Sequence, residues 1–152
     1  MSKLAKIVKM GRPWWIKTGA ELSDEIINHT HKKRLDVHGK RFRGLTPEYA
    51  ERKASGKLRR VGSGNSEANL FATGDMLGDL NVKRSSDDSV TIGWGALESQ
   101  KVVGNANKGR VITSKSKPLS KLVEKFLQKR IDTQTKKNIK KNDTVTVHKL
   151  GK

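Results

Sequence analysis

Helical spacing of apolar residues predicts a long helix over residues 18–37. Leu22, Ile26 and Ile27 recur near the 3.6-residue period, with acidic residues early in the segment and basic residues late. That order of charges suits the helix dipole. Gly39 follows the segment and is expected to end the helix.

A second, shorter helix is predicted over residues 46–54. Thr46 offers an N-cap hydroxyl, and Pro47 takes the first helical position, where its missing N–H costs nothing. The two helices then form a corner like that of a helix-turn-helix. We expect Phe42 and Tyr49 to anchor this corner to the core.

The middle of the chain has the two-residue period of strands. After the segment 57–68, which is rich in Gly, Ser and charge, residues 80–85 and 89–94 are predicted as two strands joined by a turn at Ser86-Asp87-Asp88. Alternation in the second strand buries one face of the sheet. The alternating residues are Val90, Ile92 and Trp94.

A last amphipathic helix is predicted from Ser120 onwards, after a brief helix at 96–103 and a loop at 104–110. Its apolar face holds Leu122, Val123, Phe126, Leu127 and Ile131, and another face holds Lys121, Lys125 and Lys129. Beyond Lys136 the lysine-rich chain is expected to fray. Residues 144–150 are expected to be either a strand added to a partner or a tail.

These elements predict an α+β fold: a small antiparallel β-sheet packed against a long N-terminal helix and a C-terminal amphipathic helix, with a flexible loop near residues 57–68. Residues 18–140 form a single domain in this interpretation, between a basic N-terminal arm at 1–17 that holds a Trp pair and a basic C-terminal tail at 141–152. The expected core residues are Val90, Ile92, Trp94, Leu122, Val123 and Phe126.

Charge is concentrated at the two ends of this chain of 152 residues. The net charge is +18, and residues 1–60 contribute +10, residues 61–114 contribute −1 and residues 115–152 contribute +9. Such a field attracts nucleic acid or acidic protein surfaces, although lysines that only keep a small domain soluble are the simpler alternative.

Several classes of protein are excluded or not expected. Cysteine is absent, which excludes disulfides, thiolate metal sites and cysteine nucleophiles. No run approaches the roughly 20 apolar residues of a membrane span, and the basic N-terminus lacks the apolar stretch of a secretory signal. We therefore expect no membrane partner, and assembly in the cytosol.

No set of side chains with catalytic or metal-binding spacing is found. His29 and His31 are two apart on a predicted helix and so point to different faces, and His38 and His148 are expected on the surface with them. Asp87 and Asp88 belong to a turn, and neither glycine-rich stretch matches a phosphate-binding loop. We expect no enzyme and no catalytic, metal or cofactor site.

Aromatic residues next to cations raise the alternative of a small basic nucleic-acid-binding protein. Trp14 and Trp15 lie beside Arg12 and Lys17, a pattern that can stack bases. We favour burial of one Trp ring in the core and of the other against a protein partner. The candidates for a protein interface are Trp14, Trp15, Arg12, Arg59, Arg60 and Arg110, and those for DNA contact are Lys136, Lys137, Lys140 and Lys141.

Four segments, in this order along the chain, resemble the virion-morphogenesis proteins of tailed bacteriophages. They are "HGKRFRGLTPEYAERK", "NLFATGDMLGDL", "VTIGWG" and "GNANKGR". The residues that carry the resemblance are Gly39, Phe42, Thr46, Tyr49, Lys53, Leu70, Thr73, Gly74, Met76, Leu80, Gly93, Gly104, Asn105, Gly109 and Arg110. A histidine that many members have after the "IGWG"-like strand is missing from "ALESQKVVGNANKG".

The resemblance covers roughly residues 18–140 and implies a structural neck or tail-completion protein that joins head to tail. It implies a homo-oligomeric ring of six or twelve subunits, located in the virion neck or tail after assembly in the host cytoplasm. The implied neighbours are head-completion or connector proteins and tail terminator or tail tube proteins. Contact with packaged DNA is a further expectation, and no cofactor is implied.

Overall fold

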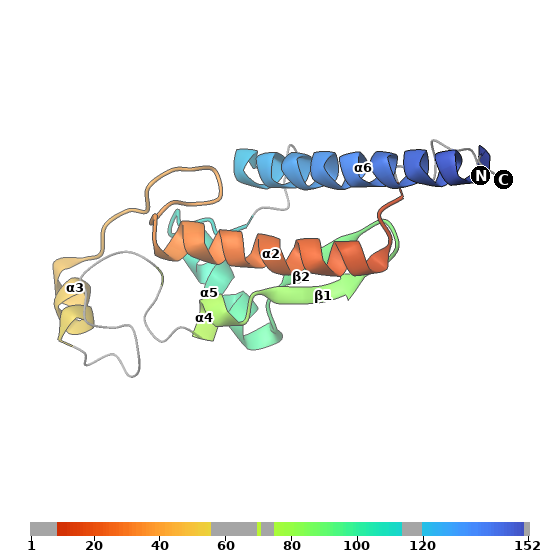
Figure 1. Cartoon of the computed structure of the whole chain (residues 1–152). Coiled ribbons are helices and arrows are strands. Elements are labelled where there is room, and N and C mark those ends of the chain that lie inside the picture. The colour runs from red at the N-terminus through yellow and green to blue at the C-terminus, as the bar shows by residue number, and fades with distance from the viewer. Residues whose placement is uncertain (1–8, 56–69, 71–74, 114–119, 151–152) are drawn as a thin grey trace.

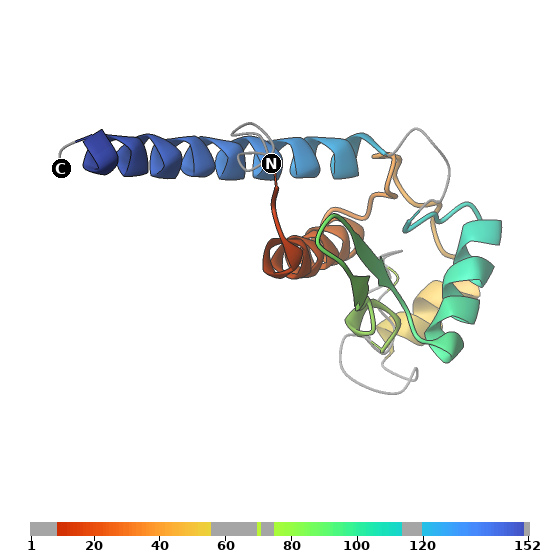
Figure 2. The same cartoon turned by 90° about the vertical axis from the view of Figure 1, so that its right-hand side faces the viewer.

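The computed structural model describes residues 9–55, 70, 75–113 and 120–150, with side chains up to residue 141. The fold is α+β, as predicted, with a two-stranded antiparallel sheet. Helix α2 (Arg12–His31) lies between that sheet and helix α6 (Lys121–Leu150) (Figure 1). Helix α5 (Ala96–Asn107) lies on the far side of the sheet from α2 (Figure 2). The predicted loop at 57–68 lies outside the described residues.

Helix α2 begins at Arg12 and not at residue 18 as predicted. Gly11, at a φ of 75°, occupies the N-cap, and Pro13 lies in the first turn, where a missing N–H breaks no helical hydrogen bond. The predicted arm at 1–17 therefore overlaps the helix, and Trp14 and Trp15 lie within the first turn of α2.

Helix α2 also ends earlier than predicted, at His31, because the following segment forms its own turn. Arg34 has a φ of 58°, which leaves the helical region. The Asp36 carboxylate accepts the backbone N–H groups of His38 and Lys40 at 2.9 and 2.7 Å. Gly39, expected to stop the helix, lies in this turn with a φ of 84°, a conformation that favours glycine.

The sheet consists of β1 (Asn81–Ser85) and β2 (Val90–Gly93), close to the predicted strands. Its register pairs Asn81 with Gly93 and Ser85 with Val90, with an irregularity after Val82. The sheet lies so close to α2 that a Cβ on Gly19 would come within 2.6 Å of Val90 Cγ2 and 2.9 Å of Val82 Cγ2.

The core forms where α2 meets helix α4 (Asp75–Gly78) and the segment around Ile112. Its buried members are Leu22, Ile26, Met76, Leu77, Leu80 and Ile112. The predicted core residues surround this cluster: Ile92, Trp94, Leu122, Val123 and Phe126 pack against it but are only partly buried, and Val90 is also partly buried. A two-stranded sheet leaves part of every strand exposed, which explains the incomplete burial of Val90 and Ile92.

Two of the later helices are longer than predicted. Helix α5 continues to Asn107, so half of the predicted loop at 104–110 is helical. Its end is a Schellman motif: Gly109, at a φ of 74°, donates to Ala106 O, and Arg110 N donates to Asn105 O, both at 2.9 Å. Helix α6 continues to Leu150, through the region expected to fray and through the predicted strand or tail at 144–150.

Candidate assembly surfaces

The Trp pair packs within its own chain as well as facing outward. Trp14 and Trp15 are both half-buried and stack edge to face, with ring centroids 4.8 Å apart. The Arg130 guanidinium of α6 lies 5.9 Å from the centre of the Trp14 ring. Trp14 is therefore part of the contact between α2 and α6, and Arg12 at the same end donates from Nε to Ser85 Oγ at 3.2 Å.

Arg130 is the polar centre of that contact, a role that our sequence analysis missed. It forms an ion pair with Glu21 and donates to the fully buried Thr18 hydroxyl at 3.3 Å. A signal was present in the sequence, since Arg130 lies four residues after Phe126 and seven after Val123, on the predicted apolar face. A basic residue on such a face is expected to pair with an acidic side chain.

The opposite face of α6 carries the lysine row, which we define as Lys121, Lys125, Lys129, Lys136 and Lys140. All five side chains are exposed. At 100° and 1.5 Å per residue, they fall within about 100° of arc and extend along about 28 Å of the helix. Asp132 lies within the row and accepts a hydrogen bond from Gln128 at 2.8 Å.

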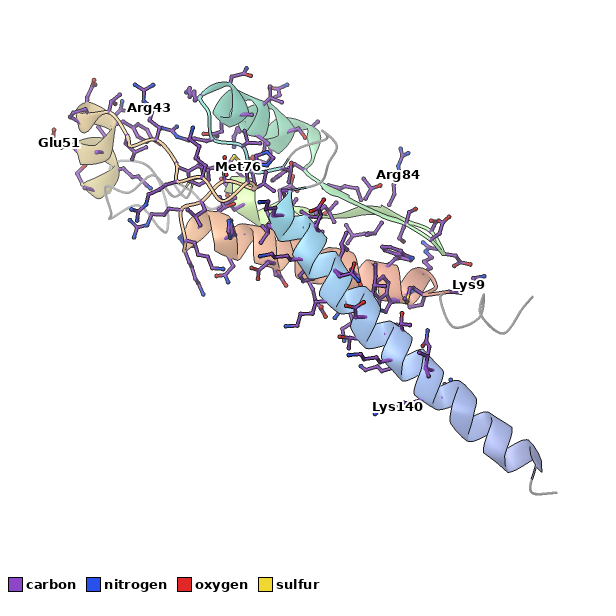
Figure 3. All side chains as sticks on the ribbon, turned by 90° about the horizontal axis from the view of Figure 1, so that it is seen from above. Lys9, Arg43, Glu51, Met76, Arg84 and Lys140 are labelled. Atoms are coloured by element: carbon purple, nitrogen blue, oxygen red, sulfur yellow. The ribbon has the colours of Figure 1, made fainter. Side chains whose placement is uncertain are left out.

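The C-terminal half of α6 extends beyond the N-terminal end of α2 (Figures 2 and 3). Figure 3 shows Lys140 on this overhanging part. The four predicted DNA-contact lysines, Lys136, Lys137, Lys140 and Lys141, are all helical and all exposed. This segment also carries the apolar Ile139 at 42% exposure. A helix segment that is mostly polar and extends beyond the helix it packs on is typical of one that meets a partner.

Helix α5 carries a second exposed surface, which we call the α5 face, centred on Leu97 and Val103. These side chains are 79% and 59% exposed, and no residue of α5 is fully buried. The only charged residues of the helix are Glu98 and Lys101, which pair at 2.7 Å. Leu97 and Val103 lie about 120° apart around the helix axis, with the exposed Gln100 between them. The α5 face therefore has two exposed apolar positions, and the charges of the helix cancel. The predicted helix at 96–103 contained both residues, but the sequence does not show which of its sides the rest of the fold leaves uncovered.

Residues of the family resemblance divide between the core and the surface. Met76 is buried, and its carbonyl accepts the Trp94 indole N–H at 2.7 Å, while the Asn105 amide lies 3.6 Å from its sulfur. These contacts join α4, β2 and α5. Leu70 also packs against the core, and Gly104 has no neighbouring atom that a Cβ would meet.

The predicted corner is anchored to the core by Phe42 but not by Tyr49. Phe42 is 7% exposed, whereas Tyr49, on helix α3 (Pro47–Ala54), is 39% exposed. Tyr49 lies in the first turn of α3 and the buried face of that helix is occupied by Lys53, at 2% exposure. Thr46 occupies the N-cap as predicted, without a hydrogen bond from its side chain.

The other predicted residues have no defined role in the described part of the chain. Arg110 is half-buried, and its Nε is inaccessible with no hydrogen-bond partner. A Cβ on Gly93 would lie 3.8 Å from Lys83 Cγ, which is an ordinary contact distance. Arg59, Arg60, Thr73 and Gly74 lie outside the described residues.

Titratable groups do not converge in the described part of the chain. No three His, Asp or Glu side chains there are placed to hold a metal ion. His29 differs from the prediction of a surface residue, because both of its ring nitrogens are inaccessible to solvent. The Ser86 hydroxyl, which donates to the carboxylate, lowers the pKa of Asp88 below 3.8. No helix among the described residues has both the length and the apolar character to cross a membrane.

Comparison of the chain with protein-family models, with curated proteins and with solved structures finds no match in any of the three.

Proposed function

We propose that this chain is a structural component of a tailed-phage virion, a neck or tail-completion protein that forms a ring and helps to join head to tail. The proposal combines the order of the four family-like segments with the α5 face. The α5 face is the observation that carries it, because two apolar side chains on one helix remain largely exposed in the isolated chain. Exposed apolar groups of this kind are typical of a surface that another protein covers.

Charge limits where identical copies of this chain can meet. A subunit with a net charge of +18 repels its copies, so contact is least costly where the local charge is low. The α5 face meets that condition, since Glu98 and Lys101 neutralise each other. We infer that this face is one half of the contact between neighbouring subunits.

A ring needs a second, different surface on each subunit, because head-to-tail contacts join unlike patches. The N-terminal end of α2 provides a candidate, with Ile16 at 42% exposure beside the half-buried Trp15. That end of α2 and α5 lie on different sides of the molecule (Figures 1 and 2). This arrangement supports a head-to-tail contact and keeps Trp15 as an interface candidate.

The test is complementation of a phage that lacks the gene, with the Leu97→Asp/Val103→Asp double variant. We expect the purified variant to fold with unchanged thermal stability, and lysates to contain heads and tails that are not joined. Tyr49→Asp is the control, since it places one aspartate at another exposed aromatic or apolar position, and it is expected to complement. Full infectivity of the double variant would contradict the proposal.

A further inference from the structure

The lysine row is not explained by a contact between subunits, since five exposed cations on one face would repel a second copy. It is also not explained by folding, because α6 packs on α2 through its other face, at Arg130 and the apolar residues near it. We propose that the lysine row binds the phosphate backbone of duplex DNA. This rests on the proposed function in one respect, that the duplex is the packaged genome.

The composition of the row favours a polyanion over an acidic protein. Protein interfaces have an apolar or aromatic centre and are depleted in lysine. The side chains between the lysines in the middle of the row are polar, and the exposed Ile139 lies towards its C-terminal end. An open depression of about 410 Å³ lies along its middle, lined by Lys125, Gln128, Lys129, Asp132, Thr133 and Lys136.

The geometry of the row favours duplex over single-stranded DNA. Single-strand binding relies on aromatic side chains that stack with bases, and the row has none. Duplex DNA carries one negative charge per roughly 1.7 Å of axis with both strands counted, so about 28 Å of duplex carries about 16 phosphates. The row meets those of them that lie on the side of the duplex facing it.

The packing of α6 determines how the helix meets the duplex. The first half of α6 is covered by α2 on one side. This half is therefore expected to lie against the sugar-phosphate backbone of the DNA and not to enter a groove. The overhanging half, on which Lys140 lies, has no such cover from α2 (Figure 3). Lysine contacts to phosphate position a protein without reading bases, so binding is expected to be independent of sequence.

Asp132 is expected to repel phosphate, since its carboxylate lies between Lys129 and Lys136 in the row. Neutralising it removes repulsion of phosphate. We therefore expect Asp132→Asn to tighten binding about two- to fivefold, a gain that a damaged fold would not produce.

The experiment measures the anisotropy of a labelled 20-base-pair duplex titrated with the full chain between 50 and 200 mM salt. The row variant carries Lys→Gln at positions 125, 129, 136 and 140. The matched control carries Lys→Gln at positions 32, 33, 40 and 108, which are equally exposed on other parts of the surface. Both variants lose the same net charge.

We expect the row variant to lose at least tenfold in affinity, with a salt dependence shallower by about 3 to 4, as four lost phosphate contacts require. The control is expected to lose less than threefold. Equal losses in both variants would overturn the proposal, because binding would then follow net charge alone. Tighter binding to a single strand of the same length, or an unchanged row variant that instead loses binding to an acidic peptide, would also overturn it.

Failure here is separate from failure of the proposed function. A chain that is present in particles but has a row variant with unchanged DNA affinity keeps its structural role and loses the DNA site. A chain that binds through the row but is absent from particles keeps the site and loses the virion role.

Discussion

Gly19 shows how a single missing side chain positions two elements. The helix and the sheet approach so closely at this residue that a methyl group would collide with Val82 and Val90, which are themselves held in the sheet. Nothing in the spacing of the sequence reveals this, because the two valines lie more than 60 residues away.

We predict that Gly19→Ala destabilises the protein by about 1–3 kcal/mol, the usual cost of overpacking a close contact. The matched control is Gly104→Ala, also within a helix, where a Cβ meets no atom within 4 Å. That change is expected to stabilise the protein by about 0.5–1 kcal/mol, since alanine is the better helix former. Urea unfolding measures both, and a stabilised Gly19→Ala variant would contradict the described packing.

The hairpin turn holds Asp88, a carboxyl group whose pKa is lowered. Because Ser86 donates a hydrogen bond to the ionised form, the pKa of Asp88 in the folded state lies below 3.8. A lowered carboxyl pKa stabilises the folded state above the unfolded pKa, and this contribution is lost as the pH falls through the folded value. The turn is therefore weakened only below about pH 3.8.

We predict that Ser86→Ala raises the pKa of Asp88 toward 3.8, as measured by NMR titration of its carboxyl carbon. Ser55→Ala serves as the control, since Ser55 donates to Arg52 O on α3 and does not contact Asp88. An unchanged midpoint in Ser86→Ala would show that the hydroxyl is not the cause.

At the scale of elements, α6 is attached to the rest of the fold through polar contacts centred on Arg130 and through apolar residues near it. The guanidinium contacts Glu21, Thr18 and the Trp14 ring together. The side chains of Arg130 and Glu21 are 25% and 36% exposed, so solvent weakens their attraction.

We predict a coupling of about 0.5–1 kcal/mol between Arg130→Met and Glu21→Gln in a double-mutant cycle of urea unfolding. The pair of Glu98 and Lys101 on α5 is the control, where one partner is 53% exposed and about 0.2–0.5 kcal/mol is expected. If the two cycles gave the same coupling, Arg130 and Glu21 would form an ordinary surface ion pair that does not hold α6 to α2.

The helix ends show which parts of this arrangement the sequence can predict. The strands at 80–85 and 89–94 and the start of α3 follow from local signals, namely alternation and Thr46-Pro47, and the structure confirms them. The start of α2 and the end of α5 depend on Gly11 and Gly109, whose positive φ breaks the helical conformation. In a polar stretch a glycine can either end a helix or lie within a loop. The local pattern does not distinguish a helix end from a loop.

At the scale of the whole molecule, the uneven charge along the chain becomes a spatial division. The lysine row lies on α6, on one side of α2, and the neutral α5 face lies beyond the sheet on the other (Figure 2). The sequence predicted two basic ends around a nearly neutral middle segment, residues 61–114. This segment contains α5, the helix that we propose for contact between copies of the chain. What the sequence did not predict is which helix face remains exposed, because that depends on how α2, α4 and the sheet share the core.

The division gives each side of the molecule a separate role in the proposed ring. In our proposal the α5 face joins subunits, and the lysine row and the overhanging half of α6 meet what passes through or lies beside the ring. A ring of this kind has a fixed number of copies in a defined orientation.

Copy number in purified particles tests the central claim most directly. Quantitative mass spectrometry against the portal and major tail proteins measures it in the phage that carries the gene. We predict a small fixed count of about six or twelve per particle, as ring symmetry requires. Absence of the chain from particles that are otherwise complete would contradict its role as a structural component of the virion.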